Sequence, residues 1–535
     1  AFDQAVRADP RHVQAASARA AMLHLLGRRA EAWAEYERAR ALAPDDARIV
    51  VNLGIVLEES GRPQDALARY DEAVALDPDC FAARLNRSAL RLRLGMPEQA
   101  LEDAERAARI DPSSAGACWN KAQALLAADR CEEALVACRQ ALERDPRHVG
   151  AHFCRALALA CLGQLTESGR AFAHARALDP QACDAMVRAA YAQAPVPAAA
   201  GTDRMPDPRV IYLVRGVERL ARCDWSGRER FLERFAEIVR DGARRGEPVR
   251  ERSLVFSSMF LPLASDVVRS LAVAVADQAA RAAPRLPALA PRPRGRGEPL
   301  RVGILSAGFR RHPNAFLLAP VVQALDRRRV RAFGYVLNPP DASAEARWLA
   351  ASFDAVRMAH ALDDAALARQ IRADGIDILL DVSSGFDHAR PAVLAARPAP
   401  LCARYLGALV PSGGAWIDYR IGDAAGMSDA GEFAPEHLVR LARACWTYAT
   451  GPLALGSAPS RSEVGLPRTG AVLCAFGGPY KLDPTLFAVW MRVLAAVPGS
   501  VLWLLGDGAV ERNLKAEAAR LGVAPERLVF APRVG

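Results

Sequence analysis

The chain has 535 residues, which is more than one hydrophobic core organises, so we expect three or four domains. Its formal charge is +9, from 70 Lys plus Arg against 61 Asp plus Glu, but arginines and acidic residues alternate along most of the sequence. Only 292–297 and 326–331 are basic runs. A nucleic-acid footprint gathers positive charge on one face, so this dispersed pattern predicts a solvated surface and no nucleic-acid partner.

The eleven cysteines are an odd number without a Cys-x-x-Cys pair, which fits neither a disulfide framework nor a zinc site. We therefore expect reduced thiols. No apolar run approaches the about 18 residues of a membrane-spanning helix and no signal peptide opens the chain, which predicts a cytoplasmic protein without a membrane partner. The sequence begins without Met inside a helical pattern, so we expect that the N-terminus is cut.

Residues 1–180 repeat with a period of 34 residues. The period is marked by Pro10, Pro44, Pro78, Pro112, Pro146 and Pro180, and by Ala5, Ala39, Ala73, Ala107, Ala141 and Ala175. Turn positions follow the same register, with Gly27, Gly61, Gly95, Asp129 and Gly163. This pattern is typical of the tetratricopeptide repeat, whose helix pairs bury their apolar faces only by stacking. We predict a curved solenoid of five full repeats after a partial first one, with a groove that binds partners.

Asparagines recur on the first helix of three repeats, at Asn52, Asn86 and Asn120, each eight residues after the repeat proline. The side chain of Asn offers both a donor and an acceptor, which suits the main chain of an extended peptide. The series therefore predicts a polypeptide-binding ladder in the groove. The alternative is that each amide satisfies a neighbouring backbone group.

Residues 181–298 lose the period but keep helical patterning, and they end in a Pro/Arg-rich stretch, so we expect a helical connector and a linker. Between 299 and 460, short apolar runs alternate with helical segments, which predicts a Rossmann-like domain with a parallel sheet covered on both faces. A second unit of this kind occupies 461–535. Its three strands and two helices are half an open α/β sheet, so we expect it to be incomplete.

Lys481 is one of only three lysines in the chain, with Lys121 and Lys515, and it follows a Gly-Gly-Pro turn. Asp483 is a good N-cap and Pro484 suits the first helical position, so a helix is predicted to begin just after Lys481. The free N–H groups and positive dipole end of a helix attract phosphate. We therefore expect a phosphate site here, with a surface cation beside a turn as the alternative.

His312 follows the first strand of the first α/β domain, at the sheet edge where open α/β sheets place ligands. A histidine at such an edge can accept a proton from a hydroxyl group or orient that group. The alternative is a histidine that caps the next helix.

Several segments resemble, in order, the catalytic region of the O-GlcNAc transferase and SPINDLY family. They include RVGILSAGFRRHPNAFLL, DGIDILLDVSSG, ARPAPLCARYLGALVPSGG and CAFGGPYKLDPTLFAVW, and with the repeats the similarity covers essentially the whole chain. The resemblance implies a GT-B fold with twin Rossmann-like domains. It also implies an inverting, metal-independent transfer of a sugar, such as GlcNAc from UDP-GlcNAc, to Ser or Thr of polypeptides, with no cofactor.

By the same resemblance, His312 and Lys481 are the expected catalytic residues, and Lys481 contacts the donor diphosphate. Asp381, Leu406 and Gly407 are the expected donor-binding positions in the matching motifs.

The chain departs from the family pattern at Gly308, Gly385, Ala408 to Pro411, Gly477 and Gly478. Two alternatives therefore stand beside the enzyme. One is a repeat scaffold with a degenerate, inactive transferase domain, and the other is the same enzyme class with GDP-fucose as donor.

Overall fold

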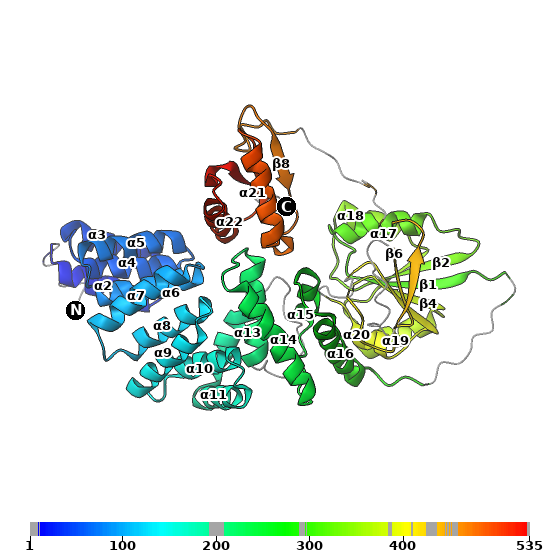
Figure 1. Cartoon of the computed structure of the whole chain (residues 1–535), viewed down its shortest axis with the longest axis horizontal. Helices are drawn as coiled ribbons and strands as arrows, with labels where there is room; N and C mark the ends of the chain where they lie inside the picture. Colours follow the sequence, from blue (N-terminus) through cyan, green and yellow to red (C-terminus); the bar gives the residue numbers. More distant parts are fainter. Residues whose placement is uncertain are drawn as a thin grey trace. The chain divides into compact units, whose positions relative to one another are not determined.

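The computed structural model describes residues 9, 11–191, 208–287, 295, 297–383, 388–407, 410–423, 436–444, 446, 449, 451 and 458–531 (Figure 1). The chain divides into two compact units, one of Ala1–Arg188 with Pro206–Tyr212 and the other of Ala189–Met205 with Leu213–Gly535. Within the described ranges, no helix combines the length and the apolar character needed to cross a bilayer.

The first unit is a stack of helix pairs, drawn blue to cyan in Figure 1. The pairs are α2 (Val13–Leu25) with α3 (Arg29–Leu42), α4 (Ala47–Glu59) with α5 (Pro63–Leu76), α6 (Phe81–Arg93) with α7 (Pro97–Ile110), α8 (Ala115–Ala127) with α9 (Cys131–Arg144), and α10 (Val149–Cys161) with α11 (Leu165–Leu178). The predicted repeat alanines from Ala39 to Ala175 are fully buried. Small side chains at these positions let the helices of a pair pack closely.

The turn inside each pair adopts the left-handed conformation that the repeat pattern requires. Gly27, Gly61, Gly95 and Gly163 have φ between 71° and 75°, and Asp129 has φ 58° in the equivalent place. Glycine reaches this region without strain, whereas a residue with a Cβ does so at a cost. The predicted repeat architecture is confirmed, including its one irregular turn.

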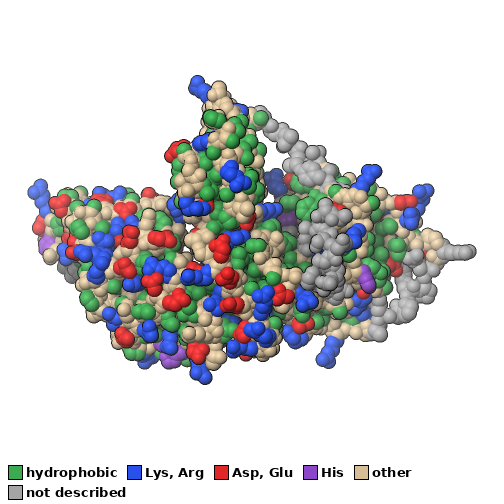
Figure 2. Space-filling model, viewed as in Figure 1, with side chains coloured by type: hydrophobic (Ala, Val, Ile, Leu, Met, Phe, Trp, Pro, Cys, Tyr) green, Lys and Arg blue, Asp and Glu red, His purple; other side chains and the backbone are tan. Residues whose placement is uncertain are grey.

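The charged side chains of the repeats are mixed on the surface, as the sequence predicts. Figure 2 shows Lys and Arg interspersed with Asp and Glu over the repeat helices on the face in view. Many form ion pairs within or between helices, such as Arg40 with Glu72 and Arg106 with Asp79. The surface of the repeats therefore carries positive and negative charges side by side.

One prediction about the cysteines is wrong. Cys131 and Cys161 form a disulfide, with their Cα atoms 6.3 Å apart. Cys131 begins α9 and Cys161 ends α10, and the stacking of successive repeats brings these two helix ends together. Among the other described cysteines, seven are buried free thiols and Cys474 is exposed.

The connector is helical, as predicted. It comprises α12 (Pro180–Tyr191), α13 (Pro208–Ala221), α14 (Arg228–Arg244), α15 (Arg252–Ser257), the short η1 (Ser258–Phe260) and α16 (Ser265–Ala282). On α14, Phe231, Phe235 and Ile238 are fully buried at helical spacing, so one face of this helix belongs to a core.

The first α/β domain contains a seven-stranded parallel sheet in the order β3-β2-β1-β4-β5-β6-β7. The strands are β1 (Leu300–Ser306), β2 (Val330–Val336), β3 (Ala355–Met358), β4 (Ile378–Asp381), β5 (Leu401–Tyr405), β6 (Tyr419–Asp423) and β7 (His437–Leu441). The helices are α17 (Pro313–Gln323), α18 (Ala344–Ala351), α19 (Asp364–Ala373) and α20 (Pro391–Ala395). Separate hydrophobic clusters pack around Leu305 and Ile304, which point to opposite faces, so both faces are covered.

The second α/β domain has a three-stranded parallel sheet in the order β10-β9-β8. Its elements are β8 (Val472–Ala475), η2 (Pro479–Lys481), α21 (Pro484–Ala496), β9 (Val501–Leu505), α22 (Gly508–Arg520), η3 (Pro525–Arg527) and β10 (Leu528–Ala531). The predicted alternation of strands and helices is confirmed. The fold class is therefore a helical repeat region followed by parallel α/β domains.

Candidate functional site

The carboxyl edge of the first sheet is held by hydrogen bonds between the loops that follow β1 and β4. The Ser383 hydroxyl accepts from the backbone N–H of Ala307 at 2.7 Å, and the amide of Asn314 donates to the carbonyl of Val382 at 3.1 Å. Gly308 N–H donates to the Ser306 hydroxyl at 3.0 Å. These hydrogen bonds are buried, so they fix the backbone at the edge where the candidate residues lie.

His312 is the N-cap of α17, and its ring nitrogen Nδ1 accepts a hydrogen bond from the backbone N–H of Asn314 at 3.2 Å. The capping role, which the sequence left open as an alternative, is thus present. A neutral imidazole that accepts through Nδ1 carries its proton on Nε2. In this tautomer His312 can donate a hydrogen bond from Nε2, but it cannot take up a proton there.

Asp381 is the last residue of β4 and is buried at this edge, where its Oδ1 accepts from the backbone N–H of Ser383 at 2.9 Å. Leu406 and Gly407 follow β5 at the same edge. Both have left-handed backbones, with φ 58° and 71°. A left-handed leucine is uncommon and marks a backbone that its surroundings hold in place. The structure therefore brings His312, Asp381, Leu406 and Gly407 to one sheet edge.

Arg404 is a residue that the sequence reasoning missed. It lies inside β5 and is fully buried, and its guanidinium donates to the carbonyl of Val410 at 2.9 Å. Burial lowers the pKa of Arg404, and the nearby charges of Asp381 and Glu436 oppose that shift. An arginine within an otherwise apolar strand was a signal in the sequence. It places a permanent positive charge beside Asp381.

A pocket opens beside this charged group. Its polar lining includes Asp381, Arg404 and Ser412, and Trp416 contributes to its apolar wall. Ser412 is fixed by Glu436, whose carboxylate accepts from the Ser412 hydroxyl at 2.8 Å and from its N–H at 2.9 Å. An apolar pocket with a few fixed polar groups has the character of a small-ligand site.

Lys481 lies on the loop that follows β8 in the second α/β domain, at the end of η2. Its side chain is exposed, with Nζ 5.7 Å from the centre of the Tyr480 ring. As predicted, Asp483 is the N-cap of α21 and Pro484 is its first residue, and the Asp483 carboxylate accepts from Thr485 N–H at 2.8 Å. An exposed cation thus precedes a capped helix N-terminus.

The connector holds the loop of Lys481, which the sequence reasoning did not anticipate. Arg228 forms a 2.8 Å ion pair with Asp483, and Cys223 Sγ lies 3.7 Å from the carbonyl oxygen of Pro479. The rings of Phe260 and Tyr480 pack edge to face at 5.1 Å. Burial raises the pKa of the Cys223 thiol to about 12, so this cysteine is an apolar packing group.

Some of the positions that depart from the family pattern lie among the residues that the structure describes. A Cβ at Gly308 would lie 2.7 Å from the Cβ of Asn314, so a side chain fits there only if α17 shifts. A Cβ at Gly477 meets no atom within 4 Å, whereas one at Gly478 would meet the Tyr480 ring at 2.5 Å. Gly385 and the segment 408–409 lie outside the described residues.

The asparagine series is not uniform. Asn120 is buried and donates from its side-chain amide to the carbonyl of Leu85 at 3.0 Å, which is the backbone-satisfying role that the sequence left open. Asn52 and Asn86 are half-buried on α4 and α6. A peptide-binding role stays a prediction for these two positions, and it fits Asn120 poorly because its donor is already used.

Two family models match the chain. One, described as glycosyl transferase family 41, matches residues 222–452 and 453–534, which is more than half of the sequence. The other, tetratricopeptide repeat, matches residues 51–115 and 120–182.

Among curated proteins, the chain is similar to a probable UDP-N-acetylglucosamine–peptide N-acetylglucosaminyltransferase SEC of Arabidopsis thaliana. The two are 29% identical over 238 residues, which is 43% of this chain and 24% of that protein. A Caenorhabditis elegans UDP-N-acetylglucosamine–peptide N-acetylglucosaminyltransferase is 33% identical over 129 residues, 24% of this chain and 11% of that protein. The matches thus span about a quarter or less of these relatives' lengths.

Among solved structures, the chain is similar to a mutant of Thermobaculum terrenum O-GlcNAc transferase. The match covers 91% of this chain and 74% of that one, with 23% sequence identity and a TM-score of 0.42.

Proposed function

Because the chain belongs to glycosyl transferase family 41, we propose that it transfers a sugar from a nucleotide donor to Ser or Thr hydroxyls of polypeptides. The proposed donor is UDP-GlcNAc, since the related proteins are named for transfer of N-acetylglucosamine from that donor. The proposed reaction inverts the anomeric centre in a single displacement and needs neither a metal nor a cofactor. The repeat groove is the proposed binding surface for the polypeptide.

The observation that carries the proposal is the placement of Lys481 before the N-terminus of α21. Departure of a nucleoside diphosphate builds negative charge on its phosphate oxygens. A lysine ammonium stabilises such charge, which lowers the barrier without a metal. Lys481 is exposed and Asp483 is held by Arg228, so the lysine rather than the cap is available to the phosphate.

His312 acts in this proposal as a hydrogen-bond donor. Its Nδ1 accepts the cap contact from Asn314, and in that tautomer Nε2–H is the proposed donor to the acceptor hydroxyl or to a donor oxygen. The hydroxyl proton then passes to a phosphate oxygen of the departing diphosphate, where negative charge accumulates. Asp381, Leu406 and Gly407 lie at the same sheet edge and are the proposed positions for the sugar half of the donor.

A transfer assay tests the proposal. The full-length protein is incubated with a candidate acceptor protein and with radiolabelled UDP-GlcNAc or GDP-fucose in the presence of a chelator. We expect label from UDP-GlcNAc on Ser or Thr, and its loss in Lys481→Ala. Lys515→Ala is the matched control, because Lys515 is a lysine of the same domain that pairs with Glu511 on the helix surface. Transfer from GDP-fucose alone would identify GDP-fucose as the donor and leave the proposed enzyme class unchanged.

A repeat scaffold with an inactive transferase domain is the second candidate, and Gly308 favours it. A side chain at this position would collide with Asn314, so the loop after β1 is built around glycine, where the related family usually carries an acid. Absence of transfer from either donor, together with retained binding of acceptor proteins by the repeats, would select the scaffold.

A further inference from the structure

One junction of the repeat stack gathers three side chains that can bind a metal. Asp129 stands at the turn position that glycine occupies in the other repeats. Cys131 begins α9 and Cys161 ends α10, at positions where the residues of the other repeats vary. Asp129 is therefore the departure from a residue that the repeats otherwise share, and it lies beside the two cysteines.

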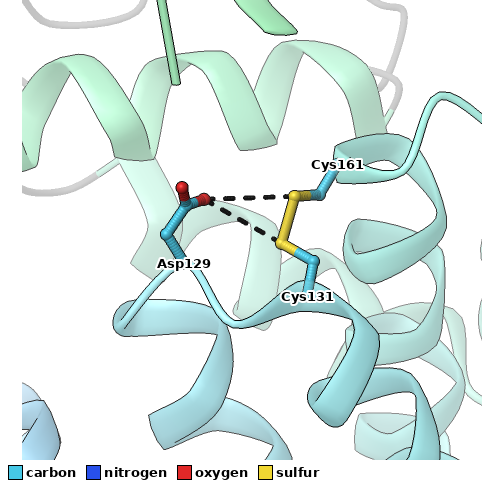
Figure 3. A group of neighbouring side chains, drawn as sticks. All are labelled: Asp129, Cys131 and Cys161. Atoms are coloured by element: carbon cyan, nitrogen blue, oxygen red, sulfur yellow. Dashed lines mark hydrogen bonds between the residues drawn. A yellow bond between two sulfur atoms is a disulfide. The ribbon is translucent and has the colours of Figure 1, made fainter. Parts of the chain in front are cut away.

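The three side chains meet in the interior, as Figure 3 shows. One ligand atom from each lies within 4.8 Å of the others. Asp129 Oδ1 is 3.9 Å from Sγ of Cys131 and 4.0 Å from Sγ of Cys161. All three residues are more than nine-tenths buried. The hydroxyl of Tyr212 donates to the same Oδ1 at 3.4 Å, which orients the carboxylate toward the sulfurs.

The disulfide uses the two cysteines and leaves the carboxylate of Asp129 to other partners. Sulfurs joined in a disulfide have no proton to donate, so the hydroxyl of Tyr212 and not the bond itself donates to this carboxylate. Asp129 also holds a left-handed backbone, which glycine adopts without strain. When the sulfurs are separate, the same three side chains offer two thiolates and a carboxylate around one point.

We propose that Asp129, Cys131 and Cys161, once the disulfide is reduced, form a binding site for Zn²⁺. Two thiolates and a carboxylate are a ligand set that zinc accepts, whereas Mg²⁺ and Ca²⁺ require oxygen ligands. Zinc–sulfur bonds of about 2.3 Å at tetrahedral angles place the two sulfurs roughly 3.8 Å apart. The Cα separation of 6.3 Å allows that spacing by side-chain rotation, and water completes the fourth position.

Metal and disulfide exclude each other because they use the same sulfur atoms. A small dithiol reduces the bond by giving two hydrogens to the protein sulfurs and closing its own disulfide. Zn²⁺ then displaces the two thiol protons. A small-molecule disulfide reverses the change: it takes two electrons from the protein thiolates and becomes two thiolates, which are protonated by water, while the protein disulfide closes and the metal is released. In both states the start of α9 stays tied to the end of α10.

Titration of the full chain with Co²⁺ as a spectroscopic stand-in for Zn²⁺ tests the site. After reduction and removal of the dithiol, we expect one Co²⁺ per chain with a sulfur-to-cobalt charge-transfer band, and displacement of the band by Zn²⁺. The oxidised chain should show no band. Cys138→Ala is the matched control, since Cys138 is another buried cysteine of α9, and it should bind as the wild type does.

Asp129→Gly restores the residue that the other repeats carry, so it should fold and bind Co²⁺ at least tenfold more weakly. At the same Zn²⁺ concentration, the Tm of the reduced wild type should rise more than that of Asp129→Gly. A band in the Cys131→Ala/Cys161→Ala double variant equal to that of the wild type would overturn the proposal, as would its absence from the reduced wild type. Wild-type affinity in Asp129→Gly would remove the carboxylate from the ligand set. None of these readouts depends on glycosyl transfer.

Discussion

The carboxylate of Asp483 makes two contacts beside Lys481, and two substitutions of Asp483 distinguish their contributions. Its Oδ1 caps α21 through Thr485 N–H, and its Oδ2 pairs with Arg228, each at 2.8 Å. Asp483→Ala removes both. A lost N-cap costs about 1 kcal/mol. The ion pair contributes about 0.5 kcal/mol, since the Asp483 side chain is 38% exposed and its charge is screened.

Asp483→Ala should therefore lower the free energy needed to open the first turn of α21 by about 1.5 kcal/mol. Amide hydrogen exchange in that turn should then be roughly tenfold faster. Asp483→Asn keeps the capping oxygen and loses only the charge, so exchange should rise by about two- to threefold. Hydrogen exchange followed by mass spectrometry on peptides across Pro484–Ala496 measures both.

Asp507 provides the matched control for this experiment. It is the N-cap residue of α22 in the same domain, but its side chain makes no capping hydrogen bond. Asp507→Ala should leave exchange in Gly508–Arg520 unchanged. Equal exchange in Asp483→Ala and Asp483→Asn would show that the cap contributes nothing, and unchanged exchange in Asp483→Ala would refute the account of this loop.

Three further outcomes are expected. Lys481→Arg should lower kcat/KM in a steady-state assay by roughly 10²-fold, because a planar guanidinium does not replace a compact ammonium beside phosphate. The control Lys515→Arg should match the wild type, and wild-type turnover of Lys481→Arg would show that Lys481 is a surface cation without a catalytic role. His312→Asn should keep the cap, and hence the Tm, while slowing transfer; unchanged transfer would assign His312 to capping alone. Asn120→Ala should destabilise the repeats by about 1–3 kcal/mol in urea unfolding, because the hydrogen bond of the buried Asn120 side chain to Leu85 is lost. Asn52→Ala should leave the free energy of unfolding within about 0.5 kcal/mol of the wild type, and equal losses in the two variants would contradict their distinct roles.

The repeats and the start of α21 could be predicted because local rules determine them. A 34-residue register fixes where each turn must be left-handed, and an Asp-Pro pair at the end of a Gly-rich loop marks a helix start. Neither inference needs knowledge of distant contacts. The same holds for the strands of the second domain, which are short apolar runs that alternate with helices.

Two strands of the first sheet were not predicted, for a physical reason. β3 and β7 are the edge strands, and most of their residues are half-buried or exposed. Edge strands with one partner lack the continuous apolar run that identifies a buried strand. The disulfide was missed for another reason, since Cys131 and Cys161 meet only when successive repeats stack.

The candidate site was predicted unevenly. Positions that follow a strand, such as His312 and Leu406, could be placed at the sheet edge from topology alone. The hydrogen bond that fixes the His312 tautomer depends on side-chain rotation, and the pairing of Arg228 with Asp483 joins residues 255 positions apart. No local pattern carries such information.

The helices from the end of α13 to α16 are structural parts of the α/β domains. Cys223 is in the hydrophobic core of the second domain, and the Trp225 ring lies 5.6 Å from that of Phe487. Gly413, after β5, is so close to the α16 backbone that a Cβ would come within 2.3 Å of Ala272. A fragment cut at residue 299 would expose apolar surface on both domains. Any rearrangement of this gene that moves the α/β domains to a new protein must therefore carry α14 to α16 and the end of α13 with them.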